Sequence, residues 1–264
     1  MGSSKMYFLT AYGFNSKAER KMETTKSIVY LIPAFLDEQS IHGIPPYVVD
    51  AVKDCEVFFV ENERSARRYF KQVWKEMVID DYQWFVVDKH VADLTKNTET
   101  NRAFKQAIKE NKRIGVVSEA GCPGIADPGQ LLVHIAHQMG ATVKPLVGPS
   151  SILLALMASG MNGQHFQFAG YLPIDNAERM KAIKDLEQES SRRNCTQIFI
   201  ETPYRNNQLL ETLLKTCNPS THLCIAANLT ATNEFVKTKT IGDWKKNPHD
   251  LHKQPAIFLL LSQF

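Results

Sequence analysis

Short apolar runs alternate along the first half of the chain with longer segments whose apolar positions recur every three to four residues. The runs are rich in β-branched and aromatic side chains, which predicts strands at Ile28–Ile32, Cys55–Val60, Trp84–Val87, Ile114–Val117 and Thr142–Val147. The segments between them predict helices over 46–53, 63–77, 99–112 and 128–139. This alternation predicts an α/β fold with a mostly parallel sheet and helices on its faces.

The pattern changes at Gly148-Pro149-Ser150-Ser151, where we expect a domain boundary. Ser150 is a predicted N-cap for a helix over Ser151–Ser159, and Asp175 is a predicted N-cap for a second helix. A third helix is expected to begin at Thr202-Pro203. The remaining runs predict strands at Phe166–Tyr171, Thr196–Glu201, His222–Asn228, Glu234–Ile241 and Ala256–Leu261. The last two are expected to pair antiparallel, which would make a mixed second sheet.

We therefore expect three parts. An N-terminal extension covers residues 1–26 and its structure is left open. An α/β domain covers 27–148 and a second α/β domain covers 149–264, with a cleft between the two domains.

The composition limits the class of protein but does not indicate a function. With 264 residues, 44% of them hydrophobic and 22% charged, the chain is typical of a globular protein, and its net charge of +3 is too small to indicate nucleic acid by itself. Five scattered cysteines without a C-x-x-C pair argue against a disulfide framework or a zinc site and suit a cytoplasmic protein. No apolar run is long enough to span a bilayer, and we expect neither a metal nor a membrane partner.

The most informative segment follows the strand at 114–117. Residues 118–129, the glycine-rich loop, read Ser-Glu-Ala-Gly-Cys-Pro-Gly-Ile-Ala-Asp-Pro-Gly, and Asp127-Pro128 is typical of a helix start. Its glycines do not match the dinucleotide-binding G-x-G-x-x-G, and no Lys-Ser/Thr pair of a phosphate loop follows. The loop lies at a strand end where ligands bind, and it fits a nucleotide-like cofactor without phosphate better than one that carries phosphate. The alternative is a tight turn that binds no ligand.

The glycine-rich loop resembles the signature of the tetrapyrrole methylase family. The nearest branch methylates a ribose 2′-hydroxyl of small-subunit ribosomal RNA, and its loop reads Ser-Asp-Ala-Gly-Thr-Pro-Gly-Ile-Ser-Asp-Pro-Gly. Here Glu119, Cys122 and Ala126 depart from it. Further resemblances are Gly148-Pro149-Ser150-Ser151-Ile152, Tyr171-Leu172-Pro173 and Glu201-Thr202-Pro203-Tyr204-Arg205.

This resemblance runs from about residue 28 to residue 261. It implies a two-domain methyltransferase, commonly a homodimer, that holds S-adenosylmethionine between its domains. The cofactor-binding positions it implies are Pro33, Glu119, Ala120, Gly121, Pro123, Gly124, Ile125, Ala126, Ser150, Ser151, Ile152, Tyr171, Leu172, Ala227, Asn228 and Leu229. Asn228 and Ala231 replace an acid and a base of the family, and Ala34-Phe35 replaces its Gly-Asn.

A basic stripe follows helical spacing opposite the apolar face of the helix predicted at 63–77. It consists of Arg64, Arg67, Arg68, Lys71 and Lys75. The stripe is either a solvated helix face or, as the resemblance implies, an RNA-binding surface whose cations neutralise phosphates.

Three functions stay open at this point. The first is methylation of a ribose 2′-hydroxyl of small-subunit ribosomal RNA, with that RNA or subunit as the partner. The second is methylation of a tetrapyrrole or another small acceptor, since fold alone does not decide the acceptor. The third is a protein that binds S-adenosylmethionine but has lost catalysis. The sequence identifies no convincing catalytic residue, and Lys89 and His90 are only weak candidates for a general base.

Overall fold

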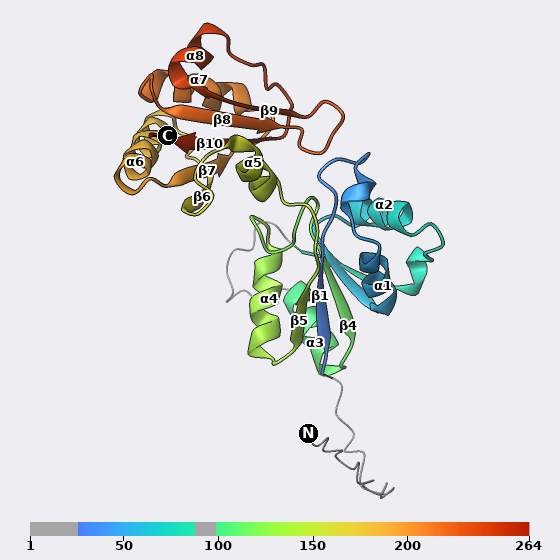
Figure 1. The fold of residues 1–264 in the computed structure, drawn as a ribbon. Coiled ribbons are helices and arrows are strands. Elements are labelled where there is room, and N and C mark those ends of the chain that lie inside the picture. Colours follow the sequence, from blue (N-terminus) through green and yellow to red (C-terminus); the bar gives the residue numbers. More distant parts are fainter. Residues whose placement is uncertain (1–25, 88–98, 264) are drawn as a thin grey trace, which may run out of the picture.

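The computed structural model describes residues 26–87 and 99–263, whose two five-stranded sheets lie in separate halves of the molecule (Figure 1). In the first half the strand order is β3-β2-β4-β1-β5, and every neighbouring pair is parallel. The strands are β1 (Ile28–Ile32), β2 (Val57–Val60), β3 (Gln83–Val86), β4 (Arg113–Val117) and β5 (Thr142–Pro145). The predicted parallel sheet is confirmed.

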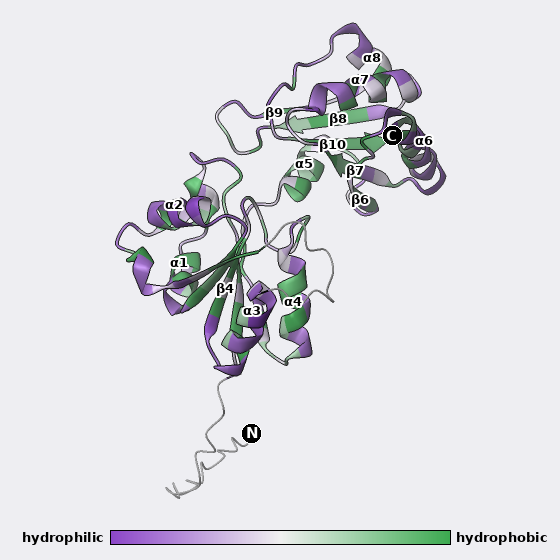
Figure 2. Ribbon diagram, turned by 180° about the vertical axis from the view of Figure 1, so that it is seen from behind, coloured by the Kyte–Doolittle hydropathy of each residue, from purple (hydrophilic) through white to green (hydrophobic). Residues whose placement is uncertain are grey.

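Helices cover both faces of this first sheet. One face packs against α1 (Tyr47–Asp54) and α2 (Glu63–Val73), the other against α3 (Glu99–Lys109) and α4 (Gly129–Gln138). Neighbouring side chains of β2 point to opposite faces, so Phe58 meets Phe70 of α2 at 4.7 Å between ring centroids while Phe59 meets Phe104 of α3 at 4.9 Å. Figure 2 shows the resulting apolar strands between helices whose outer faces are hydrophilic.

Several helix boundaries differ from the predictions; α3, for example, ends at Lys109 rather than at residue 112. The helix predicted over 63–77 ends at Val73, because Trp74 takes an extended backbone conformation and the chain turns. Met77 is nevertheless fully buried, so a turn brings it to the core, and apolar spacing alone cannot distinguish that turn from one more turn of helix. The helix after the glycine-rich loop begins at Gly129 with Pro128, rather than Asp127, at its N-cap position.

The second half holds a mixed sheet in the order β6-β7-β10-β8-β9. Its strands are β6 (Phe166–Tyr171), β7 (Thr196–Ile200), β8 (His222–Ala227), β9 (Phe235–Thr240) and β10 (Ala256–Leu261). Strands β6 and β7 are parallel and the other pairs antiparallel, which confirms the predicted mixed sheet.

The predicted pairing of the last two strands is wrong, because β10 lies between β7 and β8 whereas β9 pairs only with β8. Every residue of β10 is buried, as a central strand requires. Strand β9 carries Lys237 and Lys239, and charged side chains of this kind are typical of a sheet edge.

Helix α5 (Ser151–Ser159) packs on one face of the second sheet. The other face is covered by α6 (Asn176–Arg193), α7 (Asn206–Thr216) and α8 (Ile241–Lys246). The helix predicted to begin at Thr202-Pro203 begins instead at Asn206. The Thr202 amide donates to Glu201 Oε1 at 2.7 Å, and Arg205 folds back onto the same oxygen, so these residues form a turn.

The two halves are joined by residues 146–150 between β5 and α5, and a division at 148/149 stays a prediction. A second connection is a hydrogen bond at 2.5 Å from the Ser40 hydroxyl to the Thr230 carbonyl. The N-terminal extension, apart from Lys26, lies outside the described residues.

Candidate active site

The site begins where β1 and β4 end side by side, with Ile32 opposite Val117. After β1 the chain continues to α1 on one face of the sheet, and after β4 it continues to α4 on the other. Loops that leave neighbouring parallel strands toward opposite faces open a crevice at the carboxyl ends, which is the usual ligand site of such sheets.

Hydrogen bonds fix the two loops of this crevice to each other. Ala34 N donates to Gly121 O at 2.9 Å, and Gly121 N donates to Ala34 O at 3.1 Å. The Tyr69 hydroxyl of α2 donates to Pro33 O at 2.6 Å, and the Glu119 amide donates to Glu61 Oε1 at 2.9 Å. The first loop therefore supports the glycine-rich loop although Ala34 stands where the family has glycine.

The glycine-rich loop is shaped by its backbone and by Asp127. Gly121 and Gly124 have φ of +74° and +81°, a region that side chains with a Cβ atom disfavour. Asp127 Oδ1 accepts the amides of Gly124 at 2.8 Å and Gly129 at 2.7 Å, so one carboxylate holds both the loop and the start of α4. Burial raises the pKa of Asp127, the charge of Glu61 adds to that rise, and the two amides oppose it.

The loop faces a cleft of about 490 Å³ whose walls come from both halves of the molecule. That size lies within the range of pockets that enclose a cofactor-sized ligand. The predicted cofactor positions that line the cleft are Glu119, Ala120, Ile125, Ala126, Ser151, Tyr171, Asn228 and Leu229.

The other predicted cofactor positions lie beside or behind the cleft. Gly121, Ser150 and Ile152 line an adjoining cavity of about 100 Å³, and the Ser150 hydroxyl also accepts the Leu153 amide as the predicted cap of α5. The structure does not bring the side chains of Pro33, Pro123, Leu172 and Ala227 to either cavity, because they are buried within the walls. Gly124 lines neither cavity, and its left-handed backbone conformation shapes the glycine-rich loop.

Two groups of cleft residues are absent from the cofactor positions that the sequence predicts. Glu61 and Glu201 follow β2 and β7 at their carboxyl ends, and an acid directly after an apolar run was the available signal. Ala256 and Ile257 begin β10, and their place in the cleft depends on the insertion of that strand between β7 and β8. That insertion is a long-range pairing, which the local pattern does not show.

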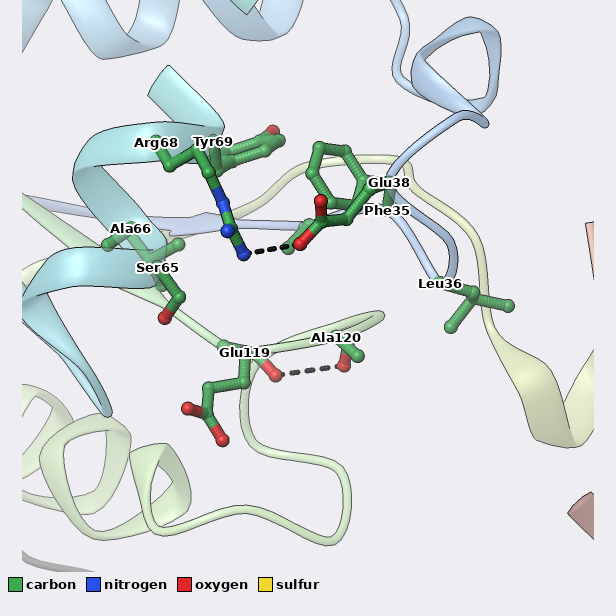
Figure 3. Close-up of a pocket in the computed structure, with 12 residues that line it drawn as sticks. Phe35, Leu36, Glu38, Ser65, Ala66, Arg68, Tyr69, Glu119 and Ala120 are labelled. Atoms are coloured by element: carbon green, nitrogen blue, oxygen red, sulfur yellow. Dashed lines mark hydrogen bonds and ion pairs between the residues drawn. The ribbon is translucent and has the colours of Figure 1, made fainter. Parts of the chain in front are cut away.

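The basic stripe approaches the cleft through a second cavity (Figure 3). This cavity of about 220 Å³ is lined by Phe35, Glu38, Arg68 and Glu119 among others, and it shares Glu119 with the cleft. Arg68 forms an ion pair with Glu38 across it, as the close-up shows. The predicted stripe therefore includes one cation at the rim of the candidate site.

The other cations of the stripe have different surroundings. Arg67 forms an ion pair with Glu63 and lies 5.5 Å from the centroid of the Trp84 ring, so it also serves as local structure. Lys71 Nζ donates to the Lys75 carbonyl at 2.9 Å, and the side chains of Arg64, Lys71 and Lys75 are exposed.

Residues 228–231 form a tight turn after β8 and border the cleft. Asn228 and Thr230 both have left-handed φ, of +51° and +72°, and a β-branched residue in that region is strained. The side-chain nitrogen Nδ2 of Asn228 donates to Gln254 Oε1 at 2.7 Å, so the residue that replaces the family's acid is held by the second half itself. Strain of this kind often occurs at functional sites.

Lys89 and His90, the weak base candidates, lie outside the described residues. Within residues 26–87 and 99–263, no group of three His, Cys, Asp or Glu side chains could hold a metal ion. In the same ranges, no helix combines the length and apolar character needed to cross a membrane.

Comparison with known proteins identifies the family. Residues 41–245 match the family described as Tetrapyrrole (Corrin/Porphyrin) Methylases. The chain belongs to this family. Solved structures of similar fold include diphthine synthase, with a TM-score of 0.62 at 14% identity over 89% of each chain. Another is uroporphyrin-III-C-methyltransferase from Thermus thermophilus, with a TM-score of 0.53 at 17% identity over 90% of this chain and 95% of that one.

Curated relatives of this methylase family member include several proteins named ribosomal RNA small subunit methyltransferase I. The protein of Vibrio cholerae is 38% identical over 82% of this chain and 69% of its own length. The protein of Escherichia coli O157:H7 is 30% identical over 67% of this chain and 63% of its own length. The match thus spans less than two thirds of the Escherichia relative, and the same holds for a Buchnera aphidicola relative, at 64%.

Proposed function

We propose that this protein is an S-adenosylmethionine-dependent methyltransferase that acts on a ribose 2′-hydroxyl of small-subunit ribosomal RNA. The observation that carries the proposal is the glycine-rich loop, which reads as the family signature and faces a cofactor-sized cleft at the ends of β1 and β4. The names of the Vibrio and Escherichia relatives support the acceptor.

The residues of the cleft fit S-adenosylmethionine. The backbone turns at Gly121 and Gly124 allow a ligand to approach the main chain, and the first-half wall carries Glu61, Glu119 and Asp127. Carboxylates favour a ligand with a sulfonium and an ammonium group and disfavour a phosphate. When bound, the cofactor would supply an electrophilic methyl group.

The residues proposed to hold the cofactor come from both halves. They are the loop at 119–126, the start of α5 at 150–152, the end of β6 at 171–172 and the turn at 227–229, with Pro33 supporting the loop from behind. Methyl transfer from a sulfonium needs alignment of donor and acceptor more than covalent help from the protein. Two walls joined through residues 146–150 and the Ser40–Thr230 hydrogen bond suit that task.

Ribosomal RNA as the partner is supported by the basic stripe on α2. Arg68 lies in the rim of the cavity that adjoins the cleft, so cations on the same helix could bind phosphates next to an acceptor ribose. The proposed reaction would take place in the cytoplasm, where small ribosomal subunits are present.

We also propose that the protein is a homodimer. Leu153 and Met157 of α5 are 52% and 78% exposed, and Phe166 of the edge strand β6 is 40% exposed. Large exposed apolar side chains are typical of an interface between proteins when they form a continuous surface.

A second candidate is a protein that binds S-adenosylmethionine without turnover. It is favoured by Asn228 and Ala231, which stand where the family has an acid and a base and which line the cleft. Titration calorimetry with S-adenosylhomocysteine, followed by a methylation assay on deproteinised small subunits from a strain that lacks this gene, separates the candidates. Binding with methyl transfer to a ribose supports the enzyme, binding without transfer supports the second candidate, and no binding contradicts both.

A further inference from the structure

A further cavity lies outside the candidate site, beside β9 at the edge of the second sheet (Figure 1). This β9 cavity has a volume of about 280 Å³. Two lysines, three rings and a short segment line it: Lys237, Lys239, Phe235, Trp244, His249, Asn247 and Pro248. Both lysines lie on the face of β9 that packs against α8, because side chains two residues apart on a strand point the same way.

The two lysines are open to a ligand. Lys237 is exposed, whereas Lys239 is half-buried and its Nζ lies 4.4 Å from the centroid of the Trp244 ring. Trp244 is fully buried, so this cation–π contact fixes the ammonium group above an apolar floor. In the part of the chain that the structure describes, neither lysine forms an ion pair with a carboxylate.

Acidic residues flank the cavity in the chain but do not line it. Glu234 accepts an amide of the turn that precedes β9, and Asp250 accepts a hydrogen bond from α7. Asp243 pairs with Lys246, which lowers its pKa, and the charge of Lys239 adds a smaller contribution. The β9 cavity therefore favours an anionic ligand.

Aromatic rings border the lysines. His249 stacks on Phe235 with 3.8 Å between ring centroids and 3° between ring planes, and both side chains are half-buried. Cations beside rings are typical of grooves that bind single-stranded nucleic acid, where the cations follow the backbone and the rings contact bases. An acidic protein segment would use the cations but not the rings, so RNA is the better match.

The β9 cavity is close to the cleft. Ala226 lines the cleft and pairs with Val236, and Lys237 and Lys239 follow on the same strand. At about 3.3 Å per residue, the two lysines lie roughly 3 and 10 Å along β9 from Val236. Because the carboxylates of the cleft disfavour phosphate, an RNA acceptor needs its flanking phosphates to be bound outside the cleft.

We propose that the β9 cavity binds backbone phosphates of single-stranded RNA next to the acceptor nucleotide, through Lys237 and Lys239. The inference rests on the proposed function and adds a contact in the second half to the proposed contact of α2 in the first. One RNA strand is then held by both halves, which fixes its position relative to the cleft.

The test combines Lys237→Gln with Lys239→Gln, because glutamine removes the charge and keeps part of the stem that covers Trp244. Fluorescence anisotropy of a single-stranded RNA fragment, in a salt series without cofactor, should show affinity lower by about tenfold at 0.1 M salt. The negative slope of log affinity against log salt should become shallower by about 1.4. In a methylation assay KM for the RNA should rise by a similar factor while kcat stays unchanged, because the lost contacts are away from the reacting atoms.

Lys181→Gln combined with Lys184→Gln is the matched control. Both lysines are exposed on α6, which packs against β7 and β10, away from the edge formed by β9. This variant removes the same charge from the same half and should leave the RNA affinity and its salt slope unchanged.

Equal salt slopes for the two double variants would overturn the inference and leave the proposed function standing. A loss of polyglutamate affinity as large as the loss of RNA affinity would also overturn it, because it would indicate an acidic protein segment as the ligand. A wild type that does not bind S-adenosylhomocysteine would instead remove the proposed function. The RNA measurement contains no cofactor, so the two failures are distinguishable.

Discussion

Asp127 shows how one side chain can shape a ligand loop. Its Oδ1 accepts the amides of both Gly124 and Gly129, and burial raises its pKa. A raised pKa in the folded state means that the folded protein binds the proton more tightly than the unfolded chain does. The stabilising contribution is therefore complete below the unfolded pKa, 3.8, and is lost as the pH rises through the raised folded pKa.

Asp127→Asn tests this account at the residue scale. The asparagine carbonyl can still accept both amides and has no charge to desolvate, so the variant should gain stability relative to the wild type as the pH rises from about 4 to 7. Urea unfolding across that range measures the difference. Asp127→Ala, the control, leaves two partly buried amides unpaired and should cost about 1–3 kcal/mol at every pH. A difference between Asn and wild type that shrinks as pH rises would contradict the account.

At the scale of single elements, the sequence identified β1, α5, β6 and β10 with the bounds that the structure has. Strong local signals explain this success, such as the Ser150 cap and the apolar run of β10. The order of strands in the second sheet could not be predicted in the same way, because the pairing of β10 with β7 and β8 is non-local.

In the candidate site, too, the features that depend on contiguous residues could be predicted and those that depend on distant segments could not. The glycine-rich loop is a contiguous motif, and its positions could be identified from the sequence. Glu201 belongs to the motif at 201–205 that resembles the family's, and the structure pairs its carboxylate with Arg205. What the sequence could not reveal is burial, because the low exposure of Glu201 depends on packing between segments far apart in the chain.

Helix α2 carries the prediction about RNA. Replacement of the exposed Arg64 and Lys71 by alanine should weaken binding of a single-stranded RNA fragment. The negative slope of log affinity against log salt should become shallower by about 1.4, or roughly 0.7 for each phosphate that is no longer neutralised. Fluorescence anisotropy at several salt concentrations provides both values. Alanine at Lys105 and Lys109 on α3, across the first sheet, is the matched control and should change neither. Equal slopes for the two double variants would assign the stripe to a solvated face.

At the scale of the whole molecule, helix α5 provides a test of the proposed homodimer. Helix α5 presents Met157, 78% exposed, on the side turned away from the second sheet, and the neighbouring Leu153 is also exposed. Burying such side chains between two copies would gain about 25 cal/mol for each Å² of apolar surface removed from water. A lysine placed at Met157 would put a charge in that interface, and a buried charge without a partner is strongly unfavourable.

We therefore expect Met157→Lys to dissociate the proposed homodimer. Light scattering after size exclusion should give twice the chain mass of 29.9 kDa for the wild type and that mass itself for the variant. Lys181→Glu on the exposed face of α6 changes charge on the opposite face of the second sheet and should leave the dimer intact. A wild type that elutes at the single-chain mass at all concentrations would exclude the dimer, while a Met157→Lys protein that stays at twice the mass would place its interface elsewhere. Because Met157 does not line the cleft, S-adenosylhomocysteine affinity of the monomeric variant then measures whether each copy holds a complete cofactor site.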